Sequence, residues 1–230
     1  MTTRHTISHA DEVYKGDVHY GPYSPDGRRG LKLGDIVFHT YGAIVTADAD
    51  GYCASQDLTA AGVFSVDVTA AAALAAAALA GTADVPRNVV AAWTGTAVIT
   101  ITGTDAYGQT VVESSGSGTS LTGKKAFKTV TGIAVSGNVT GLTVGTGVVI
   151  GLPVRIDNLD QLYVNMDGAS TTSTTVAAVD TDPATATTGD VRGTFISGTA
   201  PNSARRFSVL ICQPDTSTKE LAFGVSQFAG

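Results

Sequence analysis

The chain contains 230 residues, of which 43% are hydrophobic and 15% are charged, whereas an average soluble domain has roughly 25% charged residues. The formal net charge is −6, and Lys and Arg occur in pairs at most. This argues against general nucleic-acid binding, which requires clustered basic residues to neutralise phosphates. Val, Thr and 27 Gly residues favour strands and turns. We therefore expect an all-β fold, an antiparallel sandwich or a barrel-like body, in one large domain or two small ones.

Residues 1–30 are expected to form an extended N-terminal arm. Tyrosines in this segment alternate with Gly and Pro, and neither the strand period nor the helix period is sustained. The segment also lacks the apolar stretch of a secretory signal. Tyr offers a large amphipathic contact surface, so one interpretation is that the arm becomes ordered against a partner; the other is a mobile terminus. Under the first interpretation the contact residues are Tyr14, Tyr20, Tyr23, Arg28 and Arg29.

The folded part is expected to begin at Leu31. Two strands are predicted at residues 35–40 and 43–47, joined near Gly42, and a further strand at Gly62–Val68.

An alanine-rich run at residues 69–80 is the one place where local propensity favours a helix. A run of this length is marginal for an isolated helix and shorter than the roughly 20 residues that span a bilayer. We expect at most one short helix or an irregular crossing here, and no membrane insertion.

The clearest β pattern lies at residues 97–102, where apolar and polar side chains alternate strictly. Turn residues around Asp105 and Gly108 follow, and then the apolar segment 110–113. This arrangement predicts a hairpin with a loop of about four residues. The apolar face of the first strand is expected to comprise Ala97, Ile99 and Ile101.

The next segments also predict short strands separated by turns. Residues 114–123 are rich in Ser and Gly and are expected to form a loop. Residues 126–131 alternate as a strand, and a further strand at 142–144 precedes the Gly-containing segment 145–156. Gly and Pro recur at intervals of roughly 8–12 residues, which is typical of sandwiches and barrels.

The amino-acid composition changes after Asp157. Strands are predicted at residues 161–166, 191–197 and 206–212, and a long Thr-rich polar stretch separates the first two. We therefore expect a main β domain at residues 31–157. The strands of residues 158–230 either form a second small domain or complete the first one.

Five segments resemble, in order, a widespread group of structural proteins of tailed-bacteriophage particles. The resemblance covers the chain from Val63 to its end and leaves the arm outside. The segments that carry it are Asp84–Trp93, Thr100–Gln109, Gly123–Ile133, Ala186–Phe195 and Gly224–Phe228.

The resemblance implies a non-enzymatic structural role, and no catalytic or cofactor-binding residues come with it. Some proteins of this group are cement (decoration) proteins, which would make the major capsid protein the partner and the capsid surface the location, after synthesis in the host bacterial cytoplasm. Closed symmetry at a threefold axis would favour a homotrimer. Similar β domains occur in tail tubes and fibres, and a receptor- or glycan-binding module is a further alternative.

Residues suited to catalysis are scarce. Nucleophilic catalysis needs a base beside the nucleophile, but only four His are present. Three of them lie in the arm, and His39 follows Phe38 in a predicted strand, where a structural or surface role is expected. Cys53 and Cys212 lie far apart in sequence, and we expect small buried side chains rather than a disulfide.

Patterns for metal and phosphate sites are incomplete. His5 and His9 have helical i, i+4 spacing without a third ligand. Asp48 and Asp50 resemble the start of a calcium loop, but the later ligands are absent. The Gly-rich segment before Lys124 lacks the Ser or Thr that a phosphate-binding loop requires next. We therefore expect no metal and no cofactor.

Overall fold

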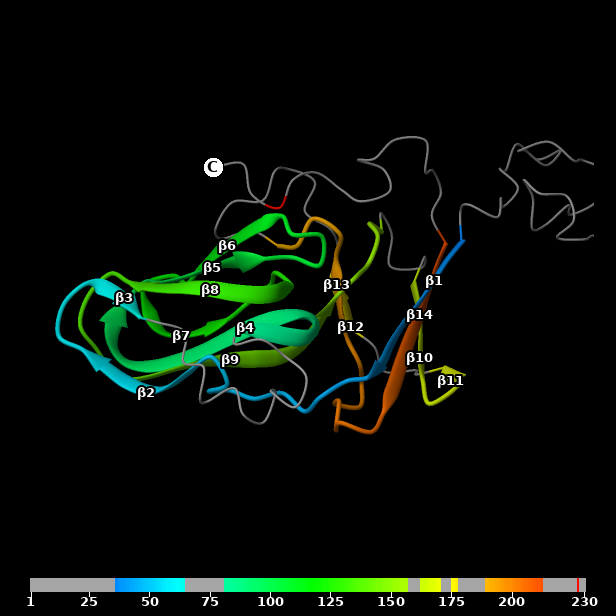
Figure 1. Ribbon diagram of the computed structural model, residues 1–230, viewed down its shortest axis with the longest axis horizontal. Helices are drawn as coiled ribbons and strands as arrows, with labels where there is room; N and C mark the ends of the chain where they lie inside the picture. Colours follow the sequence, from blue (N-terminus) through cyan, green and yellow to red (C-terminus); the bar gives the residue numbers. More distant parts are fainter. Residues whose placement is uncertain are drawn as a thin grey trace, which may run out of the picture.

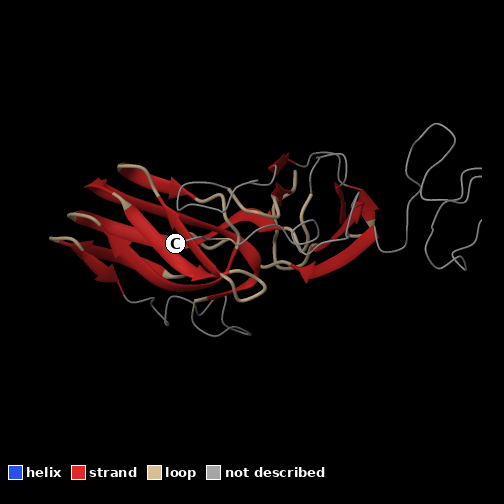
Figure 2. Cartoon of the chain, turned by 90° about the horizontal axis from the view of Figure 1, so that it is seen from above, coloured by secondary structure: helices blue, strands red, loops and turns tan. Residues whose placement is uncertain are grey.

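The computed structural model describes residues 36–64, 81–156, 162–170, 175–177 and 189–212, together with Gln227. These residues form strands, turns and loops without a helix, which confirms the all-β prediction (Figure 2). The predicted arm and the alanine-rich run lie outside the described residues.

A ten-stranded sheet forms the larger part of the molecule (Figure 1). Its strand order is β12-β13-β9-β4-β8-β5-β6, and β2, β3 and β7 pair with β9, β8 and β4 respectively. The strands are β2 (Cys53–Leu58), β3 (Gly62–Phe64), β4 (Thr82–Ala97), β5 (Ile99–Thr104), β6 (Thr110–Ser114), β7 (Gly118–Thr122), β8 (Phe127–Val135), β9 (Val139–Gly151), β12 (Thr175–Ala177) and β13 (Thr194–Ile196).

The long strand β4 converts this sheet into a sandwich. It pairs with β8 only near its beginning, at Thr82 and Arg87. Further along, β7 takes the place of β8 and pairs with Val90–Ala97. One layer therefore contains β2, β9, β4 and β7, and the other contains β3, β8, β5 and β6. The two layers lie one above the other in Figure 1.

A four-stranded antiparallel sheet stands at one end of the sandwich, at the right of Figure 1. Its order is β1 (Ile36–Ala43), β14 (Arg206–Cys212), β10 (Leu162–Met166) and β11 (Ala169–Ser170). Strand β1 thus pairs with β14, and β13 pairs with β9 of the larger sheet. Both sheets therefore take strands from both sides of the domain boundary expected at residue 157.

Several predicted strands are confirmed. The hairpin of β5 and β6 closes at Thr104 and Thr110, and its loop runs from Asp105 to Gln109. Strands β10 and β14 lie where the sequence places them. The predicted apolar face is buried at Ala97, Ile99 and Ile101.

The strand predicted at residues 43–47 is wrong, because β1 continues to Ala43 and residues 44–48 are irregular. Side chains bind part of this backbone in place of a regular strand ladder. The Asp84 carboxylate accepts from Val45 N at 2.7 Å, and the Ser203 hydroxyl accepts from Thr46 N at 3.2 Å. Local alternation predicts a strand but does not guarantee a strand partner.

Two expectations for the middle of the chain also need correction. Residues 118–122 are a strand, β7, rather than part of a loop, because the departure of β8 leaves one edge of β4 open for pairing. Residues 142–151 belong to a single strand, β9, that passes through Gly145. A Cβ at Gly145 would lie 2.0 Å from Asp48 O, so the glycine permits a close backbone contact.

The described residues form two hydrophobic cores. Burial of a large apolar side chain contributes roughly 1.5–3 kcal/mol, so both cores matter for stability. The larger core fills the sandwich and contains Tyr52, Cys53, Val89, Ala91, Trp93, Ala97, Ile99, Ile101, Val111, Leu121, Phe127, Val130, Ile133, Val135, Val139, Leu142 and Val144. The smaller core lies between one end of the sandwich and the four-stranded sheet and contains Ile44, Val85, Ile150, Leu152, Val154, Ile156, Val164, Phe195, Phe207, Val209 and Ile211.

Candidate functional site

Buried polar side chains lie between the two cores. Along β4, Val85 belongs to the smaller core and Val89 to the larger one, and Arg87 between them is 1% exposed. Along β9, Thr146 is buried between Val144 and Ile150. Buried polar groups are costly unless they find partners, so the contacts of these side chains show what the region does.

The first set of contacts is the Asp105–Arg192 network. The Arg192 guanidinium donates to Asp105 Oδ2 at 2.8 Å, and both side chains are almost fully buried. Asp105 also accepts from the backbone N–H groups of Tyr107 and Gln109, at 2.8 and 2.9 Å. The Tyr107 ring lies 5.0 Å from the Arg192 guanidinium carbon. The hairpin loop of β5 and β6 is therefore fixed to the segment before β13 by a charge-assisted contact.

Asp190 extends this network to two more segments. Its Oδ2 accepts from Ala126 N at 3.0 Å and from the Gln227 side-chain amide at 3.0 Å. Its Oδ1 accepts from Arg192 N at 2.9 Å. One buried carboxylate thus links the start of β8, the segment before β13 and the C-terminal region.

Four of the five segments that carry the phage resemblance meet in this network. Asp105 comes from Thr100–Gln109, Ala126 from Gly123–Ile133, Asp190 and Arg192 from Ala186–Phe195, and Gln227 from Gly224–Phe228. Their shared feature is a role in joining distant segments inside the protein. The segments therefore build the interior rather than a surface cleft.

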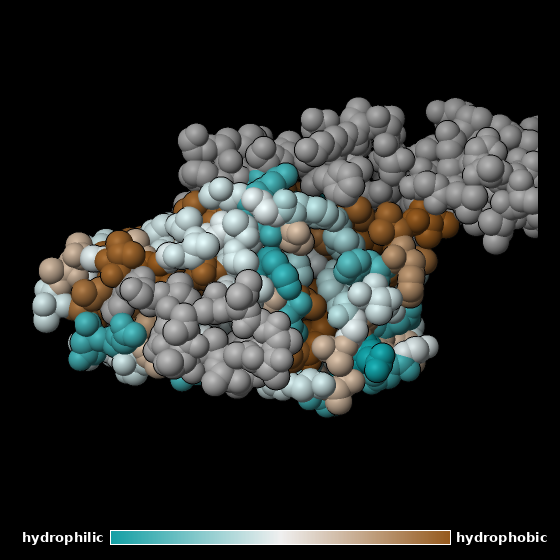
Figure 3. Space-filling model, viewed as in Figure 1, coloured by the Kyte–Doolittle hydropathy of each residue, from teal (hydrophilic) through white to brown (hydrophobic). Residues whose placement is uncertain are grey.

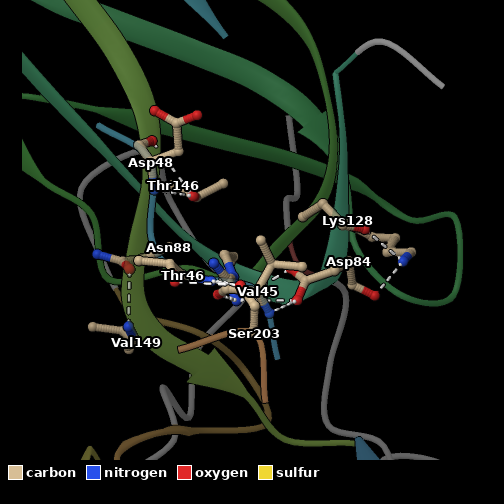
Figure 4. A network of polar contacts seen from close by, with 11 residues as sticks. Val45, Thr46, Asp48, Asp84, Asn88, Lys128, Thr146, Val149 and Ser203 are labelled. Carbon is tan, nitrogen blue, oxygen red and sulfur yellow. Dashed lines mark hydrogen bonds and ion pairs between the residues drawn. The ribbon is translucent and has the colours of Figure 1, made fainter. Parts of the chain in front are cut away.

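The fifth segment, Asp84–Trp93, supplies a second network (Figure 4). Arg87 donates to Asp84 Oδ2 at 3.2 Å and to Val45 O at 3.0 Å. The Lys128 ammonium donates to the carbonyl oxygens of Ala83 and Asp84, at 2.7 and 3.0 Å. These contacts bind the irregular segment after β1 to β4 and β8.

Asn88 of β4 and Thr146 of β9 make further contacts that Figure 4 shows. The Asn88 side chain donates to Gly123 O at 2.9 Å and accepts from Val149 N at 3.0 Å. Thr146 Oγ1 accepts from Asp48 N at 3.0 Å, and Thr146 N donates to Asp48 O at 2.6 Å. Asp48 and Asp50 thus serve in a turn, where Asp50 N donates to Asp48 Oδ1 at 3.3 Å.

Glu113 is a buried carboxyl inside the sandwich. It accepts from Lys124 N at 2.5 Å and from Lys125 N at 3.3 Å, and so fixes the turn between β7 and β8. Burial raises the pKa of Glu113 to about 7, although these two N–H groups and the two lysine charges act in the opposite direction. The turn is tight, because a Cβ at Gly123 would lie 2.6 Å from Val89 O.

Two neighbouring rows on the outer face of β5, β6 and β8 consist of small, uncharged side chains. Thr100 lies between Ser114 and Ala134 in register, and its hydroxyl is 2.8 Å from the Ser114 hydroxyl. In the next row, Thr102 lies between Val112 and Gly132. We call this the threonine face.

The outer face of the four-stranded sheet differs from the threonine face because it exposes large apolar groups. Phe38 of β1 and Tyr163 of β10 both pair with Leu210 of β14, so the three side chains form one row across the sheet. Phe38 is 64% exposed and Tyr163 is 56% exposed. Figure 3 shows apolar residues gathered over the ends of β1 and β14. We call these three residues the aromatic row.

The proposed contact residues Tyr14, Tyr20, Tyr23, Arg28 and Arg29 lie outside the described residues, as do His5 and His9. His39 lies beside Tyr41, with ring centroids 4.6 Å apart, and burial lowers its pKa. Cys53 is buried in the larger core, where its Sγ donates to Leu142 O at 3.7 Å.

Sequence reasoning did not identify the buried charged residues. Asp105 was predicted only as a turn residue, and Glu113 only as the end of a strand. The sequence does contain a signal for them. Charged residues make up only 15% of the chain, so a single charged residue beside a predicted strand is a candidate for a buried structural role. Which charges pair with each other depends on the sheet order, which local periodicity does not contain.

Among the described residues, no three His, Cys, Asp or Glu side chains gather as a metal site would. In the same part of the chain, no helix is long and apolar enough to cross a membrane. Comparison with family models, curated proteins and solved structures gives no match.

Proposed function

We propose that the chain is a structural component of a tailed-phage particle: a cement protein that binds the outer capsid lattice and stabilises it. Its partner is the major capsid protein, and its location is the capsid surface of the virion. A protein that binds only the assembled lattice lowers the free energy of the assembled state by mass action. Such a protein needs a body that keeps its shape when load is applied.

The observation that carries this proposal is the role of the five resembling segments. Four of them meet at the Asp105–Arg192 network, and the fifth supplies the Asp84–Arg87 contact. Charge-assisted hydrogen bonds are among the stronger polar contacts, and here they join segments that lie far apart in the sequence. A resemblance carried by segments that hold the interior together supports a mechanical role more than a catalytic one.

The threonine face supports close packing between copies. Short side chains such as Thr102 and Gly132 allow two sheets to approach closely, and these two rows contain no charge that would have to be desolvated. A homotrimer that uses this face at a threefold axis is the assembly we propose.

The test is co-sedimentation of the purified protein with capsids stripped of it and, separately, with purified tails. We expect saturable binding to capsids and a higher temperature of shell rupture once the sites are filled. Binding to tails alone would replace the proposal with a tube or fibre component. Binding to neither, together with binding to host-surface glycans, would favour a receptor-binding module.

The arm is tested by deleting residues 1–28. We expect weaker capsid binding with an unchanged circular dichroism spectrum, because the two described sheets begin only at Ile36. Full capsid binding by the deletion variant would show that the arm is not part of the contact. The proposed contact residues Tyr14, Tyr20, Tyr23, Arg28 and Arg29 would then be excluded.

A further inference from the structure

Within the part of the chain that the structure describes, strand β1 is an edge of the four-stranded sheet. Among the described residues its one strand partner is β14, so its other side carries no paired strand. Its sequence, IVFHTYGA, contains no Lys, Arg, Asp, Glu or Pro. Natural edge strands are usually short, charged or interrupted, because an open row of N–H and C=O groups pairs readily with another strand.

Other strands of this protein carry such protection. The opposite edge of the same sheet is β11, a strand of two residues. In the larger sheet, β2 carries Asp57 and two register shifts, and β6 points the charged Glu113 inward. Strand β1, with eight residues and no charge, differs from all three.

The regular part of β1 is symmetric about Phe38. Residues Ile36 to Thr40 pair with β14 in unbroken register, and a shift follows between Thr40 and Gly42. Phe38 is the middle residue of this regular stretch and the outermost member of the aromatic row. Two copies of β1 placed antiparallel about Phe38 would set each Val37 opposite the other copy's His39.

We propose that β1 is a contact between two copies of this chain, which pair antiparallel about a twofold axis at Phe38. The two four-stranded sheets then form one sheet of eight strands. The backbone groups of each edge become satisfied by the other, which is β-augmentation with a second copy as the partner.

The side chains of β1 are compatible with a second copy of β1 as the partner. The aromatic row of one copy continues through Phe38 into the row of the other, which buries two Phe side chains that are each 64% exposed in the single chain. No like charges meet in a self-pairing of β1, because the strand has no acidic side chain, Lys or Arg. A strand with one charge at its centre would face an identical charge in the same arrangement.

This contact does not depend on the phage assignment, and it is separate from the threefold contact at the threonine face. A protein with the β1 contact alone is a dimer, whereas one with both contacts is a pair of trimers if the twofold and threefold axes meet at right angles. The isologous twofold contact closes on itself and does not continue into a filament.

The test is sedimentation velocity of the full chain and of its Phe38→Lys variant across a range of concentrations. Phe38 is exposed, so we expect the variant to fold, which circular dichroism checks. We expect an even number of copies in the wild-type assembly and half that number in the variant, with association weakened by at least about tenfold. Val63→Lys is the matched control, because Val63 is 74% exposed on β3 of the other sheet, and it should leave the mass unchanged.

A photoreactive phenylalanine at position 38 locates the partner. We expect a cross-link to residues 36–40 of a second copy, which mixed isotope-labelled chains identify as intermolecular. A cross-link to residues of the same chain would overturn the proposal, as would a monomeric wild type at high micromolar concentration or a Phe38→Lys assembly of unchanged mass.

Discussion

The two hydrophobic cores differ in the distance along the chain between their residues. The buried members of the larger core all lie between Tyr52 and Val144, whereas those of the smaller core range from Ile44 to Ile211. The smaller core also depends on the larger one, since Val85 and Ile150 reach it from β4 and β9. The four-stranded sheet thus packs on residues that the sandwich strands supply. We therefore expect the sandwich and the four-stranded sheet to differ in stability.

The largest effect is expected from Phe127→Ala in the larger core. Phe127 is fully buried, and removing a buried aromatic ring costs about 3–5 kcal/mol. Because the smaller core rests on β4 and β9, we expect amide hydrogen exchange to accelerate in both sheets. Exchange that rises in the sandwich alone would show that the four-stranded sheet is independent.

Phe207→Ala is the matched change in the smaller core. Phe207 is 1% exposed, and the same transfer and cavity terms apply, at about 3–5 kcal/mol. We expect faster exchange in β1, β10 and β14 with the protection of β5 and β8 retained. Equal loss of protection in both sheets would mean that the protein unfolds as one unit and that the asymmetry is absent.

Asp105→Ala breaks the contact that fixes the hairpin loop. It leaves the Arg192 charge buried without Asp105, which costs about 3 kcal/mol or more. Urea unfolding measures this loss. Asp57→Ala is the control, because Asp57 is an exposed carboxylate that accepts from Gly141 N at 2.7 Å. An equal cost for both variants would contradict the importance assigned to burial.

Tyr41→Phe tests the connection between the two regions. The Tyr41 hydroxyl donates to Gly151 O at 2.7 Å and so ties β1 to the end of β9. Burial also raises the pKa of this phenol far above its ordinary value, so it remains a donor. We expect a loss of about 1 kcal/mol in the free energy of unfolding, with β1 losing more exchange protection than β5.

A dependence of stability on pH is expected from Glu113. Burial raises its folded-state pKa from 4.5 to about 7, so the folded protein binds the proton more tightly than the unfolded chain does. The stabilising contribution is full below about pH 4.5 and is lost as the pH rises through about 7. In Glu113→Gln, the free energy of unfolding should change less with pH across this window than in the wild-type protein. An unchanged dependence on pH would contradict the raised pKa of Glu113.

Local patterns in the sequence identify strands far better than they identify partners. The alternation of Ile99 and Ile101 and the turn at Asp105 predicted the β5–β6 hairpin, because each strand pairs with its neighbour in sequence. Strand β4 was not predicted as a strand; Pro86 interrupts its pattern and lies where the register shifts between Thr82 and Arg87. The pairing of β1 with β14 joins the two ends of the described chain, and no local signal contains it.

The candidate sites were harder to predict than the strands, because they arise from the sheet order. Asp105, Asp190 and Gln227 become neighbours only after β13 is placed beside β9. The aromatic row likewise needs β1, β14 and β10 in that order. In both cases the residue types were visible in the sequence, but their spatial grouping was not.

The most direct test of the proposed function is cryo-electron microscopy of stripped capsids and purified tails, each incubated with the protein. The cement proposal predicts ordered density of this all-β body at the symmetry axes of the capsid's outer surface, with none on the tail. Density on the tail alone, or an undecorated capsid at saturating protein, would contradict it.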